Sequence, residues 1–229
     1  MANSFIAPTT YFLQEGKENL EDCLKVAFQA AVQHDVSKIV IFTAYGDGVR
    51  LALDQFCSRA EYAHIKPVAV TFPVGKTFTN QNKEPIEVRI PDELIKRFGT
   101  EGVPLVRANL PFDAVEPSAA WRTVAGRGLN LLGETLNIFC GSMSLCVQAV
   151  TLACDAGYLE QGEHVISMTS DTAILAMATV TRKMLSELVV REILCKPVIL
   201  TIGRKEQQAL KAREGTPQLE AAAQHKLKE

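Results

Sequence analysis

The sequence predicts a single α/β domain with three layers, in which a mostly parallel sheet carries helices on both faces. Two patterns support this prediction. Short continuous apolar runs, such as residues 38–42, are typical of parallel strands that are buried on both faces. Between these runs lie segments whose apolar residues recur at three- and four-residue steps, as in an amphipathic helix. The alternation of the two patterns favours parallel strands joined by right-handed helical crossovers.

The two patterns assign an order of elements along the chain. The predicted strands are residues 10–13, 38–42, 67–72, 103–108 and 165–169, and the last apolar runs are 193–195 and 198–202. The predicted helices are residues 17–34, 49–57, 91–98 and 129–156, the last divided at Gly141-Ser142 because glycine ends helices and serine caps them. Residues 173–180 fit a strand or a helix, and we predict a strand. Long polar loops are expected at 73–90 and 110–127.

Length and composition predict one ligand-binding domain, residues 1–203, followed by a polar tail, residues 204–229. Of the 229 residues, 47% are hydrophobic, which suffices for a substantial core. The 24 Lys and Arg residues nearly balance the 26 Asp and Glu residues, so no basic field favours nucleic acid or an anionic membrane. The tail has few large apolar residues and a Gly215-Thr216-Pro217 break, so we expect it to be partly helical or disordered.

We expect a cytoplasmic protein that holds no metal. The first residues lack a basic region followed by an apolar core, and no window reaches the roughly 18 uncharged apolar residues of a membrane-spanning helix. The 6 cysteines are scattered through apolar segments, without a Cys-x-x-Cys pair or a histidine at ligand spacing. We interpret them as buried thiols that pack as small hydrophobic side chains.

Three turns that follow predicted strands are candidates for binding a small phosphorylated ligand. Open parallel sheets bind ligands at the carboxyl ends of their strands, where helix N-termini also point unpaired amides. The first turn is Thr43-Ala44-Tyr45-Gly46-Asp47-Gly48, whose glycines allow close backbone approach and whose threonine hydroxyl can bond an anionic oxygen. The second, residues 71–76, contains Thr71 and the cation Lys76, and the third is Thr169-Ser170-Asp171-Thr172.

Each turn also has a purely structural interpretation. The first fits a tight strand-to-helix turn capped by Asp47, Lys76 fits a solvated loop residue, and the third fits an Asx or Ser/Thr turn without a ligand. Arg107, Arg122 and Arg127 could approach the same edge, and the planar guanidinium suits phosphate. Any one of these arginines also fits the surface.

Conventional catalytic motifs are absent from the sequence. It lacks Gly-x-Gly-x-x-Gly, the phosphate-loop motif ending in Gly-Lys-Ser/Thr, His-Glu-x-x-His and Gly-x-Ser-x-Gly. The histidines precede or open predicted strands or lie in the tail, which are the wrong places for the candidate site. Acid–base chemistry would therefore fall to Asp47, Asp155 or Asp171, and Asp155 also fits a structural role at a helix end.

Several of these segments resemble a family of small microbial proteins described as pyruvate kinase α/β-domain-like. The likeness lies in Glu18-Asn19-Leu20-Glu21-Asp22-Cys23-Leu24, residues 38–42 and Tyr45-Gly46-Asp47, and later in Ala153-Cys154-Asp155-Ala156-Gly157, Asp171-Thr172-Ala173 and Ile193-Leu194-Cys195-Lys196-Pro197. These motifs are short, and together they span about residues 10–200.

The resemblance implies a fold like the carboxyl-terminal domain of pyruvate kinase, where a hydroxyl- and glycine-rich loop after a strand can hold an effector phosphate. The barrel that carries pyruvate kinase chemistry is absent, so we expect no kinase reaction. The family is associated with bound flavin mononucleotide (FMN). The resemblance would place its phosphate or ribityl chain near residues 43–47, with Asp171 and Thr172 opposite, and it matches Arg122 to an arginine of the family's central loop.

Two positions depart from the family pattern. The family's second loop is longer and rich in Gly, Arg and Ser before its Asp-Thr-Ala, whereas only Met168-Thr169-Ser170 stands here. Whether this shorter loop contacts the ligand is therefore open. A position that is often acidic in the family is Gln148, which argues against a general base there.

Three functions remain open at this point. The first is binding of a flavin or another nucleotide, by an undefined oxidoreductase or a sensor, with Tyr45, Phe72 and Trp121 as a wall for the isoalloxazine ring. The second is a non-catalytic regulatory module that binds a sugar phosphate or another phosphorylated metabolite. The third is a homo-oligomeric structural protein whose interface is formed by the helices of residues 129–156. We expect the chain to form a homo-oligomer.

Overall fold

A seven-stranded sheet forms the centre of the fold, with the strand order β1-β9-β8-β7-β2-β3-β6. The computed structural model describes residues 4–79, 82–113 and 124–198, with the side chains of 124–127 excepted. The strands are β1 (Thr10–Phe12), β2 (Lys38–Phe42), β3 (Lys66–Thr71), β6 (Leu105–Arg107), β7 (His164–Met168), β8 (Ala173–Met177) and β9 (Val189–Pro197). Only β8 runs against the others, which confirms a mostly parallel sheet.

Six α-helices connect or cover these strands in the described part of the chain. They are α1 (Leu20–Gln33), α2 (Asp47–Ala52), α3 (Asp92–Thr100), α4 (Val124–Asn137), α5 (Met143–Asp155) and α6 (Met184–Glu187). A 3-10 turn, Lys17–Asn19, leads into α1, and a π-helical turn, Leu53–Cys57, continues α2. The break between α4 and α5 confirms the division predicted at Gly141-Ser142.

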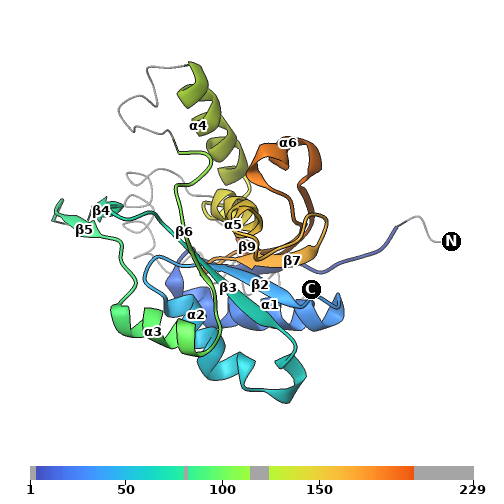
Figure 1. Cartoon of the computed structure of the whole chain (residues 1–229). Coiled ribbons are helices and arrows are strands. Elements are labelled where there is room, and N and C mark those ends of the chain that lie inside the picture. The colour runs from blue at the N-terminus through green and yellow to red at the C-terminus, as the bar shows by residue number, and fades with distance from the viewer. Residues whose placement is uncertain (1–3, 80–81, 114–123, 199–229) are drawn as a thin grey trace, which may run out of the picture.

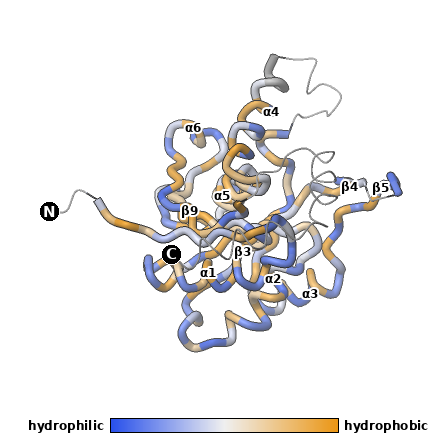
Figure 2. The backbone as a smooth tube through the Cα atoms, turned by 180° about the vertical axis from the view of Figure 1, so that it is seen from behind, coloured by the Kyte–Doolittle hydropathy of each residue, from blue (hydrophilic) through white to orange (hydrophobic). Residues whose placement is uncertain are grey.

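The helices cover both faces of the sheet, as Figure 1 shows: α1, α2 and α3 lie on one side and α5 on the other. The alternation of side chains along β2 explains this arrangement. Ile39 and Ile41 belong to the apolar cluster under α1, whereas Val40 and Phe42 belong to the cluster under α5. Each cluster contains side chains from several neighbouring strands. In Figure 2 the tube is mostly hydrophobic along α5 and the central strands. The predicted three-layer arrangement is therefore confirmed.

The structure differs in two places from the predicted alternation of strands and helices. Residues 173–180 contain strand β8, as predicted, but β8 is antiparallel to β7 because a turn of only four residues, 169–172, joins them. A parallel connection needs a crossover of about a dozen residues or more. The predicted loop 73–90 contains a hairpin of β4 (Thr77–Thr79) and β5 (Pro85–Glu87), which projects from the body in Figure 1.

No helix in the described part of the chain combines the length and apolar character needed to cross a bilayer. The predicted tail, residues 204–229, and most of the last apolar run, 198–202, lie outside the described residues.

Candidate functional site

The three predicted turns lie side by side at one edge of the sheet. Strand β2 is flanked by β7 and β3, and Ile41 of β2 is in register with Met168 of β7. Consequently Thr43 after β2, Thr71 at the end of β3 and Thr169 after β7 stand on neighbouring strands at their carboxyl ends. The tertiary structure thus gathers three segments that are far apart in the sequence into one place.

The first turn is held by its own threonine. The Oγ1 atom of Thr43 accepts a hydrogen bond from the backbone N–H of Gly46 at 2.9 Å, and the Thr43 N–H donates to the carbonyl of Val70 at 2.9 Å. Thr43 is buried, so only its hydroxyl proton is left to reach a ligand. Tyr45 is 39% exposed and Asp47, at the start of α2, is exposed. These two residues form the accessible part of this turn, because Gly48 and Val49, which follow in α2, are buried.

The glycines of the first turn are required by packing. Gly46 has a φ of 89°, and a Cβ there would lie 3.0 Å from the side chains of Ile90 and Leu94, which precede and begin α3. At Gly48 a Cβ would lie 2.9 Å from Ile41 Cγ2, so α2 can approach β2 only without a side chain. Both glycines are buried within the fold, and their presence is explained without a ligand.

The second turn contributes one cation to this edge. The ammonium group of Lys76 lies 3.5 Å from Asp113 Oδ2 and 5.5 Å from the ring centroid of Phe72. Phe72 is buried and makes an edge-on contact with Phe78 at 5.3 Å. It is therefore part of the core rather than an open wall for an aromatic ligand. Thr71 is also buried, at the end of β3.

The third turn is organised by a buried carboxylate. Asp171 Oδ2 accepts the backbone N–H of Gly16 at 2.9 Å, and Oδ1 accepts the hydroxyl of Thr172 at 3.0 Å and that of Thr169 at 3.4 Å. Asp171 is only 4% exposed and Thr172 is fully buried. Ser170, which is half-buried, is the most accessible residue of the turn. The hydrogen bonds of Asp171 hold the turn in place, and its negative charge would repel a phosphate.

Thiols surround the third turn from inside the protein. Cys23 Sγ lies 3.4 Å from Cys195 Sγ, and Cys140 Sγ lies 3.2 Å from Thr172 Oγ1. Burial raises the pKa of the Cys23 thiol well above its usual range, and the neighbouring Cys195 acts in the same direction. All the cysteines are free, and five of them, Cys23, Cys140, Cys146, Cys154 and Cys195, are buried. This confirms that they pack mainly as small apolar side chains.

Several predicted contributors do not meet at this edge or cannot be placed there. Arg122 and Trp121 lie outside the described residues, as does the side chain of Arg127. Arg107, by contrast, ends β6 in register with Thr71, so it stands at the same edge, and it is exposed. Of the ligand-facing groups proposed from the sequence, those that remain accessible in the described part of the chain are Tyr45, Asp47, Lys76, Arg107 and Ser170.

Three titratable groups away from the turns have structural partners. His34 lies 3.5 Å from Glu192, and His164 opens β7, so both stand at the amino ends of strands as expected. Asp155 is the last residue of α5 and accepts the backbone N–H of Thr181 at 3.0 Å. That contact supports the structural interpretation of Asp155.

Gln148 is a residue whose role the sequence did not reveal. Its side-chain oxygen accepts the backbone N–H of Phe112 at 2.7 Å, and its nitrogen donates to the carbonyl of Ser144 at 3.1 Å. Gln148 is buried within α5. It therefore anchors the segment that follows β6, just before the part of the chain that is not described. The pattern in the sequence that could have indicated this role is an amide side chain inside an otherwise apolar helix.

Comparison with known proteins finds only distant structural similarity. No family model matches the sequence. Two solved structures of pyruvate kinase from Cryptosporidium parvum are similar to this chain, with TM-scores of 0.32 and 0.33 and identities of 14% and 12%. The matches cover 66% and 72% of this chain, but only 20% and 23% of the pyruvate kinase chains. The structural neighbours are thus pyruvate kinase chains, and membership of the α/β-domain-like family stays a prediction.

Proposed function

We propose that the chain binds a small phosphorylated ligand at the carboxyl edge of β7, β2 and β3, with FMN or another nucleotide as the first candidate. The observation that carries the proposal is the meeting of three strand-end turns at the place where α2 begins. Backbone amides at a helix N-terminus attract anions. Lys76 supplies a cation at the same edge, and Ser170 and Tyr45 supply accessible hydroxyl groups.

The accessible groups favour binding over catalysis. Asp171 is engaged by three donors, Asp155 belongs to the end of α5, and Asp47 is exposed with an arginine, Arg50, 3.7 Å away. None of these carboxylates is both close to the turns and free of a structural partner. A flavin-dependent oxidoreductase remains the catalytic form of the proposal, since the reactive group would then belong to the cofactor.

A regulatory module for a sugar phosphate is the second candidate. It is favoured by the burial of Phe72, which leaves Tyr45 as the accessible aromatic side chain of the three described turns. A ligand without an aromatic ring does not need aromatic side chains to stack against. A purely structural homo-oligomer is the third candidate. Because α5 is buried inside its own chain, the interface would be formed by α4, where Leu131 and, just after the helix, Ile138 and Phe139 are exposed.

Melting experiments distinguish these candidates. The visible spectrum of gently purified protein is recorded first, and melting is then followed with FMN and, separately, with fructose bisphosphate. A ligand at a hundred times its dissociation constant should stabilise the fold by about 2.7 kcal/mol. We expect Lys76→Met and Ser170→Ala to reduce the rise in melting temperature that the ligand causes. The control Lys96→Met, on the exposed face of α3, should show the same rise as the original protein. A lack of any flavin spectrum and of a shift with either ligand would contradict the proposal.

A further inference from the structure

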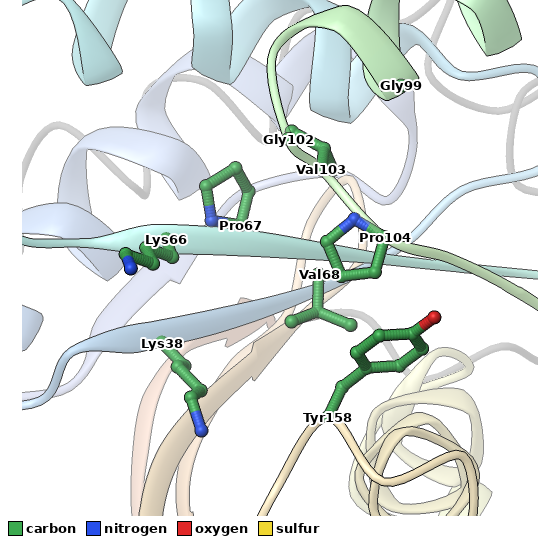
Figure 3. A pocket seen from close by; sticks show the side chains of 9 residues that line it. All are labelled: Lys38, Lys66, Pro67, Val68, Gly99, Gly102, Val103, Pro104 and Tyr158. Atoms are coloured by element: carbon green, nitrogen blue, oxygen red, sulfur yellow. The ribbon is translucent and has the colours of Figure 1, made fainter.

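A cavity lies at the opposite edge of the sheet from the three turns, where β2 and β3 begin and where α3 leads into β6 (Figure 3). Its volume is about 400 Å³, and none of the three predicted turns contributes to its lining. Strand β2 has five residues, so at about 3.3 Å per residue the two edges are separated by roughly 15 Å. A ligand here would therefore not overlap with the proposed phosphate site.

The walls of this cavity are largely apolar. Val68 is buried in β3, and Pro104 follows the end of α3, with the aromatic ring of Tyr158 close by in Figure 3. Tyr158 is 42% exposed, so its ring presents a flat face that the protein itself does not cover. Ligand pockets of about 300–1,000 Å³ with mostly apolar walls suit small organic molecules.

One end of the cavity carries positive charge. Lys38 and Lys66 stand together at one side in Figure 3, away from Tyr158 and Pro104. The ammonium group of Lys38 is neutralised by Glu163, whose Oε1 lies 3.0 Å away. Lys66 is exposed and has no ion-pair partner among residues 4–79, 82–113 and 124–198. One uncommitted cation therefore adjoins an apolar, partly aromatic surface.

The end of α3 sets the orientation that a ligand would take. Gly99 and Gly102 stand at the carboxyl end of α3, which is the negative end of the helix dipole, although the carbonyls of Arg97, Phe98 and Gly99 already accept backbone N–H groups there. An anionic group would avoid that end and lie beside Lys66. The apolar part of the ligand would then lie along Val68, Pro104 and Tyr158.

We propose that this cavity binds a small aromatic carboxylate, with the carboxylate at Lys66 and the ring against Tyr158 and Pro104. A phosphate dianion alone fits less well, because one free cation and an apolar wall leave most of its oxygens without donors. A cationic ligand is disfavoured by the two lysines. The cavity is separate from the proposed phosphate site and constitutes a second binding site.

The test uses 1-naphthoate as the probe and isothermal titration calorimetry of the full-length protein. We expect saturable binding that weakens at least about tenfold in Lys66→Met, because a charge-assisted contact is lost. Lys25→Met removes an exposed lysine of α1 and should bind like the original protein. The neutral analogue 1-naphthamide should bind at least about tenfold more weakly than the carboxylate.

A filling variant gives a second, independent test. A Cβ added at Gly99 would meet nothing within 4 Å, the position is helical and it lines the cavity, so we expect Gly99→Leu to fold with an unchanged or higher melting temperature and to occupy part of the cavity. We expect it to lose naphthoate binding. The proposal would be overturned by the absence of binding to the original protein, by equal binding in Lys66→Met, or by equal binding in a folded Gly99→Leu variant.

Discussion

Asp171 and Gly16 are joined by a hydrogen bond of 2.9 Å between a buried carboxylate oxygen and a backbone N–H. This contact connects the β7–β8 turn to the loop that leads into α1, across most of the length of the chain. Because Asp171 also accepts two threonine hydroxyls, one side chain fixes both the turn and the entrance to the first helix. The shape of the carboxyl edge near β7 depends on it.

Replacing Asp171 should destabilise the fold without changing its architecture. Hydrogen bonds to a charged group contribute about 1.5–3 kcal/mol each, and Asp171→Ala leaves the partly buried N–H of Gly16 without its acceptor. We expect the free energy of unfolding in urea to fall by about 2–4 kcal/mol. The control is Asp47→Ala, an exposed carboxylate whose partner Arg50 is 3.7 Å away, which should change it by less than about 1 kcal/mol. Equal effects at the two positions would contradict the anchoring role.

Replacing glycine by alanine should destabilise the fold at Gly48 and stabilise it at Gly99. Gly48→Ala brings a Cβ within 2.9 Å of Ile41, and overpacking of this kind costs about 1–3 kcal/mol. Gly99→Ala introduces a methyl group into an open part of α3 and should stabilise by about 0.5–1 kcal/mol. Thermal and urea unfolding of both variants measure the difference. A stabilised Gly48→Ala protein would show that α2 is not pressed against β2 as described.

Replacing Gln148 should loosen the segment that follows β6. Gln148→Leu replaces the amide by an apolar side chain of similar size, so the Phe112 N–H loses its acceptor at 2.7 Å. A buried donor left without a partner costs about 1–3 kcal/mol. Urea unfolding gives the loss of stability, and amide exchange at Phe112 should accelerate. Gln33→Leu, an exposed position at the end of α1, serves as the matched control and should leave both unchanged.

The reactivity of Cys57 should depend steeply on pH. Its thiol is half-buried, and burial, assisted by the negative charge of Glu101, raises its pKa to about 11. Since the thiolate is the nucleophile, alkylation of Cys57 by iodoacetamide should accelerate about tenfold per pH unit up to roughly pH 10. Mass spectrometry of the labelled peptide measures the rate, and Cys57→Ser identifies the signal. A plateau near pH 9 would mean that the thiol is more exposed than described.

The same shift determines how stability depends on pH. The folded chain holds the proton of Cys57 more tightly than the unfolded chain, whose thiol has a pKa of about 9.0. The stability from this group is therefore present below about pH 9 and is lost as the pH rises towards 11. Comparison of the original protein with Cys57→Ser across this range isolates the effect, and the variant should lose less stability as the pH rises.

The apolar pattern was sufficient to predict most of the fold. A run such as Lys38–Phe42 can be buried on both faces only within a covered sheet, and the stepwise apolar residues of α1 can face only one side. The positions of the three turns were also predictable, because each follows a strand directly. Composition likewise indicated that the cysteines would be buried.

The tertiary structure decided which of those residues can be reached. The antiparallel direction of β8 follows from the shortness of the 169–172 turn, and the roles of Gly46, Gly48 and Gln148 follow from contacts with segments that are distant in the sequence. A glycine that allows ligand approach and one that allows helix packing look the same in a sequence, since both lack a Cβ.

The sequence likewise does not distinguish a charged side chain that holds the fold together from one that is free to bind a ligand. From the sequence, Asp171 is a residue of a turn and Lys66 precedes a predicted strand. In the structure Asp171 is buried with three donors, and Lys66 begins β3 and borders an apolar cavity. Burial and partners depend on neighbours brought together by folding, and these decide whether a side chain holds the protein together or is free to bind a ligand. The sequence by itself determined the layers of this protein and the edge of the sheet where its turns meet, because both depend on local periodicity.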